Sequence, residues 1–341
     1  MSINSYRHLY KHLYTRLYRD LSANGHPHRR SRVCDPSGKQ RQSGVVLLAV
    51  LVLMIIVTML VSTASQLLNR NIELAQRAKI SLEDAAAVRA MAAKLSYILA
   101  VQRLTNAGIS AGTNIQAYET DEDGFFVLET TGDEIRIDGF WYFDQQTNVE
   151  YKIQSNSGLI GINSRDQIWI RKWLETTDLS MLAVNQLLDS LADYADENDD
   201  LRAAGAERDQ DYPPLNYLLQ RCEQLYSVKH WGLFLAKHPA FLADCSTRRT
   251  ASLNVNTMPV ALWNRLMPTS VDKLNEQRNA GVWFARSQDA VFVEPSLQNI
   301  SDEYFAVKGE EGYRITVRRN NTVVTHSLEI GTGGGQPVIE L

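Results

Sequence analysis

An uncharged run dominates this sequence of 341 residues, because no Asp, Glu, Lys or Arg occurs between Gly44 and Asn69. The run opens with Gly44-Val45-Val46-Leu47-Leu48 and contains 26 residues. An α-helix rises about 1.5 Å per residue, so a helix of this length crosses the hydrocarbon core of a bilayer. The run therefore predicts a single-pass transmembrane helix, and it favours a membrane-tethered protein over a soluble enzyme.

Charge is distributed unevenly on the two sides of Gly44. Residues 1–44 hold nine Lys or Arg and two Asp, which gives +7, whereas the whole chain carries −4, so residues 45–341 carry −11. A basic flank stays in the cytoplasm. We therefore expect a cytoplasmic N-terminus and an acidic C-terminal part beyond the membrane. That acidic part argues against nucleic acid as a partner, because phosphate binding needs clustered cations.

Helix-forming sequence continues beyond the apolar run. Val61–Ser65 offers small residues at which a secretory signal peptide could be cleaved. However, Gln66–Gln102 contains no Pro or Gly and is rich in helix formers. This favours one helix from about Val45 to about Leu104, with its first half in lipid and its second half packed on a domain. The apolar stripe expected to pack comprises Leu67, Leu74, Ala78, Leu82, Ala85 and Ala92.

Strand patterns lie on both sides of a long helical region. Short β-rich runs are followed by mainly helical sequence over 165–288, and then by two further strands. We expect one α+β domain whose sheet is interrupted by a helical insertion. Two tandem domains are the alternative, but neither set of strands alone is enough for a stable sheet. The expected strands are Phe125–Leu128, Ile135–Phe143, Val149–Ile153, Tyr313–Arg318 and, after the turn pair Asn320-Asn321, Thr322–Ile330.

The expected boundaries are 1–44 for a basic leader, 45–68 for the transmembrane part of the helix, 69–104 for its remaining part, 105–160 and 296–331 for the sheet domain, 161–295 for the insertion and 332–341 for a flexible tail.

Two cysteines follow the membrane segment. Cys222 and Cys245 lie on the exported side, where oxidation is permitted. A disulfide between them and a pair of buried free thiols are both compatible with the sequence.

An acidic cluster lies within the helical region. Its carboxylates and one amide are hard oxygen ligands, and no His or Cys accompanies them, so the cluster suits Ca²⁺ far better than zinc. The spacing is not that of an EF-hand. A solvated acidic loop without metal is the alternative. The cluster comprises Asp193, Asp196, Asn198, Asp199, Asp200, Glu207, Asp209 and Asp211, of which Asp193, Asp196, Asn198, Asp200 and Glu207 are the candidate calcium ligands.

Nothing in the sequence points to catalysis. Beyond the leader only His230, His238 and His326 remain, and no nucleophile-elbow, zinc-protease or phosphate-loop motif occurs. We expect neither an enzyme nor an organic cofactor. Asn254-Val255-Asn256-Thr257 precedes a helical pattern, and we expect Asn254, Asn256 and Thr257 to serve structurally in capping that helix.

Several of these stretches together resemble one family. A basic leader ending at Gly44 before a long apolar helix is the layout of type IV pilin-like proteins, most of which carry Glu five residues after the cleavage point. Here Ala49 occupies that position. With Asp193–Asp200, Gly205-Ala206-Glu207 and Asn254-Val255-Asn256-Thr257, this arrangement resembles the type II secretion system minor pseudopilin K family. Tyr194 stands where the family usually has Trp, and Met258 where it has Ala.

The resemblance implies a pilin-like fold, in which a long N-terminal helix packs on a small antiparallel sheet, with a large all-α (SAM-like) insertion. It implies cleavage between Gly44 and Val45 by prepilin peptidase and N-methylation of Val45. The protein would sit in the inner membrane with a periplasmic domain, and then at the pseudopilus tip with minor pseudopilins I and J.

The position of Ala49 suggests where in a filament such a subunit belongs. In the family's filaments the buried Glu of an incoming pilin meets the terminal amine of the subunit ahead. Ala49 offers no such carboxylate and therefore suits the first position, where it would cap and nucleate a pseudopilus for protein export across the outer membrane. A minor or tip pilin of a type IV pilus, an uncleaved signal anchor and a membrane-anchored periplasmic hydrolase are the alternatives.

Overall fold

The computed structural model describes residues 43–112, 130–198, 200–209, 211–307, 312–330 and 338–340. The expected leader up to residue 42, the expected strand Phe125–Leu128, Asp199 of the acidic cluster and the glycine-rich stretch Gly331–Gly335 lie outside these residues. The chain divides into two compact units, one ending at Asn71 and the other beginning at Ile72.

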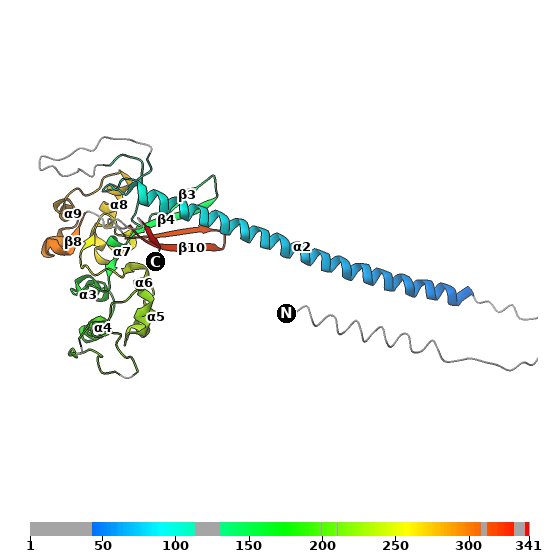
Figure 1. Cartoon of the computed structure of the whole chain (residues 1–341), viewed down its shortest axis with the longest axis horizontal. Helices are drawn as coiled ribbons and strands as arrows, with labels where there is room; N and C mark the ends of the chain where they lie inside the picture. Colours follow the sequence, from blue (N-terminus) through cyan, green and yellow to red (C-terminus); the bar gives the residue numbers. More distant parts are fainter. Residues whose placement is uncertain are drawn as a thin grey trace, which may run out of the picture. The chain divides into compact units, whose positions relative to one another are not determined.

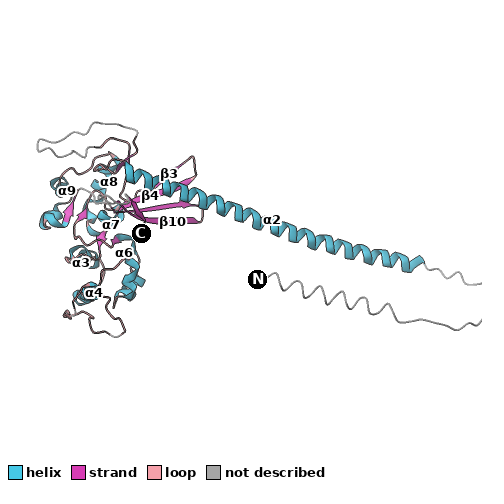
Figure 2. Cartoon of the chain, in the orientation of Figure 1, coloured by secondary structure: helices cyan, strands magenta, loops and turns pink. Residues whose placement is uncertain are grey.

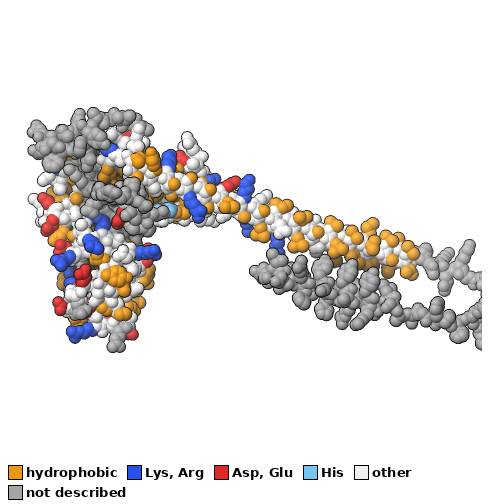
Figure 3. Space-filling model, viewed as in Figure 1, with side chains coloured by type: hydrophobic (Ala, Val, Ile, Leu, Met, Phe, Trp, Pro, Cys, Tyr) orange, Lys and Arg blue, Asp and Glu red, His pale blue; other side chains and the backbone are white. Residues whose placement is uncertain are grey.

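The first unit contains the N-terminal part of helix α2, which runs from Ser43 to Val101. The helix contains no Pro, and its only Gly is Gly44, so no residue breaks its hydrogen-bond ladder. From Val45 to Asn71 every side chain is exposed, and most are apolar (Figure 3). Within the described residues α2 alone has the length and apolar composition to cross a membrane.

The second unit begins with the C-terminal part of α2, where side chains become buried at one stripe. Four members of the expected stripe, Leu67, Leu74, Ala78 and Leu82, are exposed, so that expectation is wrong for them. Ala85 is half-buried, and Ala92 is buried as expected. The difference arises because the sheet reaches only the last turns of the helix. The buried positions follow a spacing of three and four residues and comprise Asp84, Val88, Met91, Ala92, Leu95 and Leu99.

A five-stranded antiparallel sheet packs against this stripe, in the order β11-β10-β9-β4-β3. Ile153, Ile315 and Leu328 meet Val88 and Leu95 in one apolar core, and Figures 1 and 2 show the end of α2 lying along the sheet. The strands of this sheet are β3 (Tyr142–Asp144), β4 (Val149–Ser155), β9 (Gly312–Arg319), β10 (Thr322–Ile330) and β11 (Val338–Glu340).

The hairpin between β9 and β10 follows the sequence pattern closely. Arg319 pairs with Thr322, and the turn residue Asn320 has φ of 50°, a left-handed conformation that Asn tolerates better than most residues. The expected strand Ile135–Phe143 is instead split into β2 (Glu134–Ile135) and β3, with Gly139 at φ of 80° between them. The expectation of a flexible tail is wrong for β11, because Val338–Glu340 pairs with the edge of β10.

Helices and short strands form the block between β4 and β9. Its core contains the buried aromatic side chains Trp173, Trp231, Phe241 and Trp263. The indole N–H of Trp173 donates to Asp244 Oδ2 (2.8 Å), and that of Trp231 to the Leu187 carbonyl (2.9 Å), so burial leaves these polar groups satisfied. The block comprises η1 (Asn156–Gly158), β5 (Ile160–Gly161), α3 (Ile168–Glu175), α4 (Met181–Ala195), η2 (Cys222–Ser227), α5 (Trp231–Lys237), α6 (Ala240–Asp244), β6 (Cys245–Ser246), β7 (Leu253–Asn254), α7 (Val260–Leu266), η3 (Pro268–Ser270), α8 (Val271–Asn279), α9 (Ser287–Val293), η4 (Pro295–Asn299), η5 (Asp302–Tyr304) and β8 (Phe305–Ala306).

Small pairings complete the unit. β5 pairs in parallel with β6, β7 pairs in parallel with β8, and β1 (Ile109–Ser110) pairs antiparallel with β2. A long apolar helix, an antiparallel sheet and a helical block between two of its strands make this a pilin-like α+β fold, as expected from the sequence.

Leu95→Ala tests the packing of α2 on the sheet. Leu95 is 1% exposed, so we expect its truncation to lower the free energy of unfolding by about 2–5 kcal/mol. Leu82→Ala, at a position of the same helix that is 72% exposed, should change it by less than about 0.5 kcal/mol. Urea unfolding of the full chain in detergent, followed by near-UV circular dichroism, measures both. Equal effects of the two substitutions would contradict this packing.

Candidate functional site

The predicted processing junction lies at the first turn of α2. Gly44 and Val45 are among its first residues, and Ala49 follows one turn later on the exposed apolar segment. The structure thus places all three on one continuous helix. Cleavage between Gly44 and Val45 and methylation of Val45 stay predictions.

The acidic loop after α4 is organised around the carboxylate of Asp193. This side chain is fully buried, and its Oδ2 accepts hydrogen bonds from the N–H groups of Ala206 (2.9 Å) and Glu207 (3.2 Å). A Cβ atom on Gly205 would lie 1.8 Å from that oxygen. Gly205 is therefore the residue that lets the backbone close around the carboxylate, a role that the sequence pattern Gly205-Ala206-Glu207 did not reveal.

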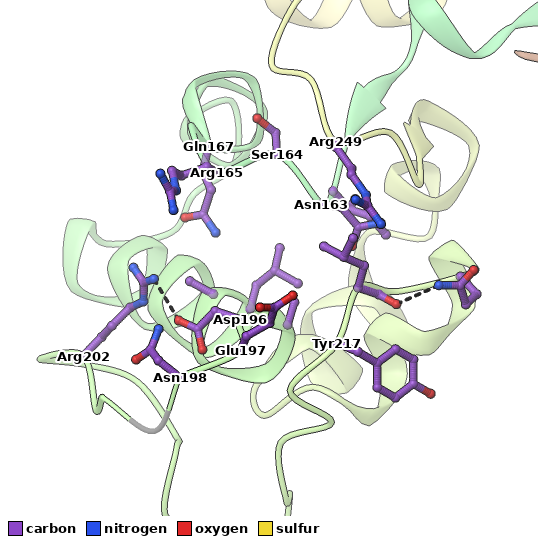
Figure 4. Close-up of a pocket in the computed structure, with 16 residues that line it drawn as sticks. Asn163, Ser164, Arg165, Gln167, Asp196, Glu197, Asn198, Arg202, Tyr217 and Arg249 are labelled. Carbon is purple, nitrogen blue, oxygen red and sulfur yellow. Dashed lines mark hydrogen bonds and ion pairs between the residues drawn. The ribbon is translucent and has the colours of Figure 1, made fainter. Parts of the chain in front are cut away.

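Arg202 supplies the positive charge beside Asp193. Its Nε lies 3.2 Å from Asp193 Oδ1, and one of its terminal nitrogens lies 3.1 Å from Asp196 Oδ2 (Figure 4). Because a buried carboxylate needs a partner, Arg202 stabilises the loop where the sequence predicted a metal ion. Arg202 was not among the residues predicted from the sequence, because the acidic pattern pointed only to oxygen ligands.

The predicted calcium ligands do not converge on one point. Within the described residues no group of three or more His, Cys, Asp or Glu side chains is arranged to hold a metal ion. Asp193 is engaged with backbone N–H groups and Arg202, and Asn198 Oδ1 accepts from the N–H of Asp200 (2.8 Å). The arrangement does not fit Ca²⁺ while Arg202 contacts Asp193 and Asp196. Calcium binding stays a prediction, and the ion would have to compete with Arg202 for these two carboxylates.

A cleft of about 710 Å³ adjoins the loop. Figure 4 shows Asp196 and Glu197 on one side, facing Arg165 and Arg249 on the other. Both signs of charge therefore line it. Ser164 donates its hydroxyl to the Asp166 carbonyl (3.0 Å), and the described lining contains no His or Cys. The expectation that the chain is no enzyme stays a prediction.

Asn254, Asn256 and Thr257 do not cap the following helix, so that prediction is wrong. Pro259 occupies the N-cap position of α7, and no side chain caps its first turn. All three residues are buried instead. Asn256 Nδ2 donates to the carbonyls of Phe284 (2.8 Å) and Val307 (2.9 Å), while its Oδ1 accepts from the N–H of Phe284 (3.0 Å). Met258 and Pro259 separate this segment from the start of α7. The segment therefore joins distant parts of the block instead of capping the helix.

A buried cation links this segment to the sheet region. One guanidinium nitrogen of Arg278 donates to Asp138 Oδ2 (2.9 Å), and the other donates to the carbonyls of Val255 (3.0 Å) and Asn256 (3.2 Å). Burial lowers the pKa of Arg278 to about 10, although the nearby Asp138 acts in the opposite direction. Arg278 and Asp138 were not among the sequence candidates, because neither belongs to a recognisable motif.

Cys222 and Cys245 are joined by a disulfide, with their Cα atoms 6.4 Å apart. The bond connects η2 to β6, and both cysteines belong to the core of the helical block. It closes a loop with a sequence separation of 23 residues.

Arg202→Gln tests the cation of the acidic loop. Losing the partner of the buried Asp193 carboxylate should lower the free energy of unfolding by about 1–2 kcal/mol. Arg208→Gln is the matched control, because Arg208 is exposed on the same loop. Thermal melting of the full chain in detergent measures both, and equal midpoints for the two variants would contradict the role of Arg202.

Calcium can be tested with the same variant. An ion held by Asp193 and Asp196 would have to displace Arg202, so Ca²⁺ should raise the melting midpoint of R202Q more than that of the unaltered chain. Identical midpoints in Ca²⁺ and in chelator for both proteins would rule the ion out.

The disulfide is tested by reduction. A loop of this length predicts that the bond contributes about 3 kcal/mol to the free energy of unfolding. A reducing agent should therefore lower the melting midpoint of the unaltered chain. It should leave unchanged the midpoint of a variant carrying Cys222→Ser and Cys245→Ser. An unaltered chain that is insensitive to reduction would contradict this contribution.

Comparison with known proteins gives matches among solved structures but none by sequence. No protein-family model matches the chain, and no curated protein matches its sequence. The chain is similar to a chain of a solved structure described as the crystal structure of the GspK-GspI-GspJ complex from the enterotoxigenic Escherichia coli type 2 secretion system. The TM-score is 0.45 and the identity 13%, over 80% of this chain and 97% of that chain. A likeness of this degree establishes no family.

Proposed function

We propose that this protein is a minor pseudopilin of a type II secretion system, which caps the pseudopilus tip and helps to nucleate its assembly. Its work is binding rather than catalysis. Its partners are minor pseudopilins I and J and the remaining pseudopilus, and prepilin peptidase processes it. It resides in the inner membrane, with its N-terminus in the cytoplasm and its C-terminal domain in the periplasm, before it joins the filament.

One observation carries the proposal: Ala49 stands where most pilin-like proteins have Glu, on an exposed apolar helix that begins at a Gly44 junction. A carboxylate at this position would need a cationic partner in the subunit ahead, because an unpaired charge is costly in an apolar environment. A subunit at the tip has no subunit ahead. Ala49 therefore fits the first position of a filament.

Two further features support this function. The excess of positive charge in residues 1–44 and of negative charge in residues 45–341 supports the orientation across the membrane. The large helical block between β4 and β9 would crowd a filament shaft, whereas a tip leaves room for it.

Gly44→Leu tests the processing. Gly has no side chain to obstruct a peptidase at the scissile bond, so Leu at this position should leave an unprocessed precursor. Gly38→Leu, the same substitution six residues earlier in the leader, should be processed normally. Gel mobility and the intact mass after co-expression with prepilin peptidase give the answer, and the mature chain should begin with methylated Val45. Normal processing of G44L would contradict the assignment of the junction.

Ala49→Glu tests the tip position. A carboxylate without a partner at the tip should reduce pseudopilus assembly and protein secretion, whereas Ala49→Val should preserve both. The measurements are filament counts by electron microscopy and the secreted fraction in cells that produce the other pseudopilins. If both variants support assembly equally, the absent carboxylate has no role in setting the position.

A further inference from the structure

A second groove, distinct from the cleft at the acidic loop, lies between the sheet and the helical block. Its volume is about 690 Å³. Ile153 and Ile315 face the α2 core, and because side chains alternate along a strand, Lys152 of β4 and Arg314 of β9 face the groove instead. The groove thus uses the sheet face that α2 does not cover.

Cations gather on this face without enough carboxylates to neutralise them. Lys152 lies opposite Thr316, which places it diagonally next to Arg314 and Arg318 on the neighbouring strand. Arg318 pairs with Glu150, but within the described residues Lys152 has no ion-pair partner. Arg314 donates to the main-chain carbonyl of Cys245 (3.2 Å), and burial lowers its pKa while the charge of Glu223 acts in the opposite direction. Burial lowers the pKa of Lys152, and the charges of Arg314 and Arg318 lower it further.

The two carboxylates that line the groove, those of Asp138 and Asp244, already have other partners. Asp138 binds the guanidinium groups of Arg136 and Arg278. Asp244 accepts from the indole N–H of Trp173 (2.8 Å), and it lies 3.7 Å from the Nε of Arg265. Lys152 is therefore left for an external anion, and the half-buried Arg314 beside it has only the nearby charge of Glu223 to offset its own.

Apolar surface borders these cations. The ring of Trp141 lies 5.1 Å from Lys152 Nζ and 4.2 Å from the guanidinium carbon of Arg318, and it is 36% exposed. Pro259, Val260 and Ala261 of the helical block form the facing wall. A small inorganic anion would leave this apolar surface unused, whereas a peptide presents a carboxylate and apolar side chains together.

We propose that this groove binds an extended acidic segment of a partner protein, with one of its carboxylates between Lys152 and Arg314 and its apolar side chains against Trp141 and Pro259–Ala261. The hydroxyls of Thr316 and Thr325, which also line the groove, can hydrogen-bond to its backbone. Charge complementarity selects the partner. Because residues 45–341 carry −11 overall, the field of the protein repels acidic peptides elsewhere, and only a local cationic site would retain one. The inference does not depend on the proposed function.

The test measures binding of a fluorescein-labelled peptide of alternating Glu and Leu by fluorescence anisotropy, with the full chain in detergent. We expect the unaltered chain to bind this peptide at least about tenfold more tightly than the matching peptide of Gln and Leu. Lys152→Gln should weaken binding of the acidic peptide about tenfold, and K152Q with Arg314→Gln should weaken it further. Lys152→Arg should retain binding, because it keeps the charge.

Lys273→Gln is the control, because Lys273 is an exposed cation on α8, outside the groove lining. It should bind like the unaltered chain. K152Q removes repulsion between like charges but also the contact of Lys152 with Trp141, so its melting midpoint is measured as well, and an unchanged midpoint shows that weaker binding does not reflect unfolding. The proposal is overturned if the unaltered chain does not bind the acidic peptide, if the Gln peptide binds equally well, or if K152Q and K273Q bind alike.

Discussion

The arrangement of the second unit depends on one buried cation, Arg278. Its guanidinium meets the Asp138 carboxylate beside the sheet and two carbonyls of the Asn254–Thr257 segment in the helical block. A second link runs in parallel, because Gln154 of β4 donates to the Thr257 carbonyl (2.9 Å). Buried ion pairs contribute little net stability, since desolvation offsets the attraction between the charges. Here the ion pair instead fixes the position of the helical block, because a misplaced block would leave Arg278 and Asp138 buried without partners.

The contacts of Arg278 and Gln154 also shape the groove between the sheet and the helical block. Asp138 and Gln154, which bind the block, line the groove beside Lys152 and Arg314. Holding the block at this place on the sheet leaves the cationic face uncovered and brings Pro259–Ala261 opposite to it. The same polar contacts that orient the block therefore create the binding surface that we infer.

Local patterns in the sequence predicted the elements that local forces determine. The uninterrupted helix α2, the strand pair β9 and β10 and the Asn320 turn follow from apolar periodicity and turn chemistry alone. The buried stripe of α2 was predicted wrongly, because which turns are covered depends on where the sheet lies. Arg202 and Gly205 were missed for a related reason, since their roles appear only when the loop folds around Asp193.

The pairing of β4 with β9 affects the order in which parts of this chain can fold. Ser155 pairs with Tyr313, so 157 residues separate two neighbours in the sheet, and the whole helical block leaves and returns at one point. An unfolded loop of that length opposes the pairing by chain entropy, whereas a folded block brings its two ends together. We therefore expect the block to form first and the centre of the sheet to close late. Because the sheet packs on the C-terminal end of α2, folding of the block would then be the step that allows the sheet against this helix to be completed.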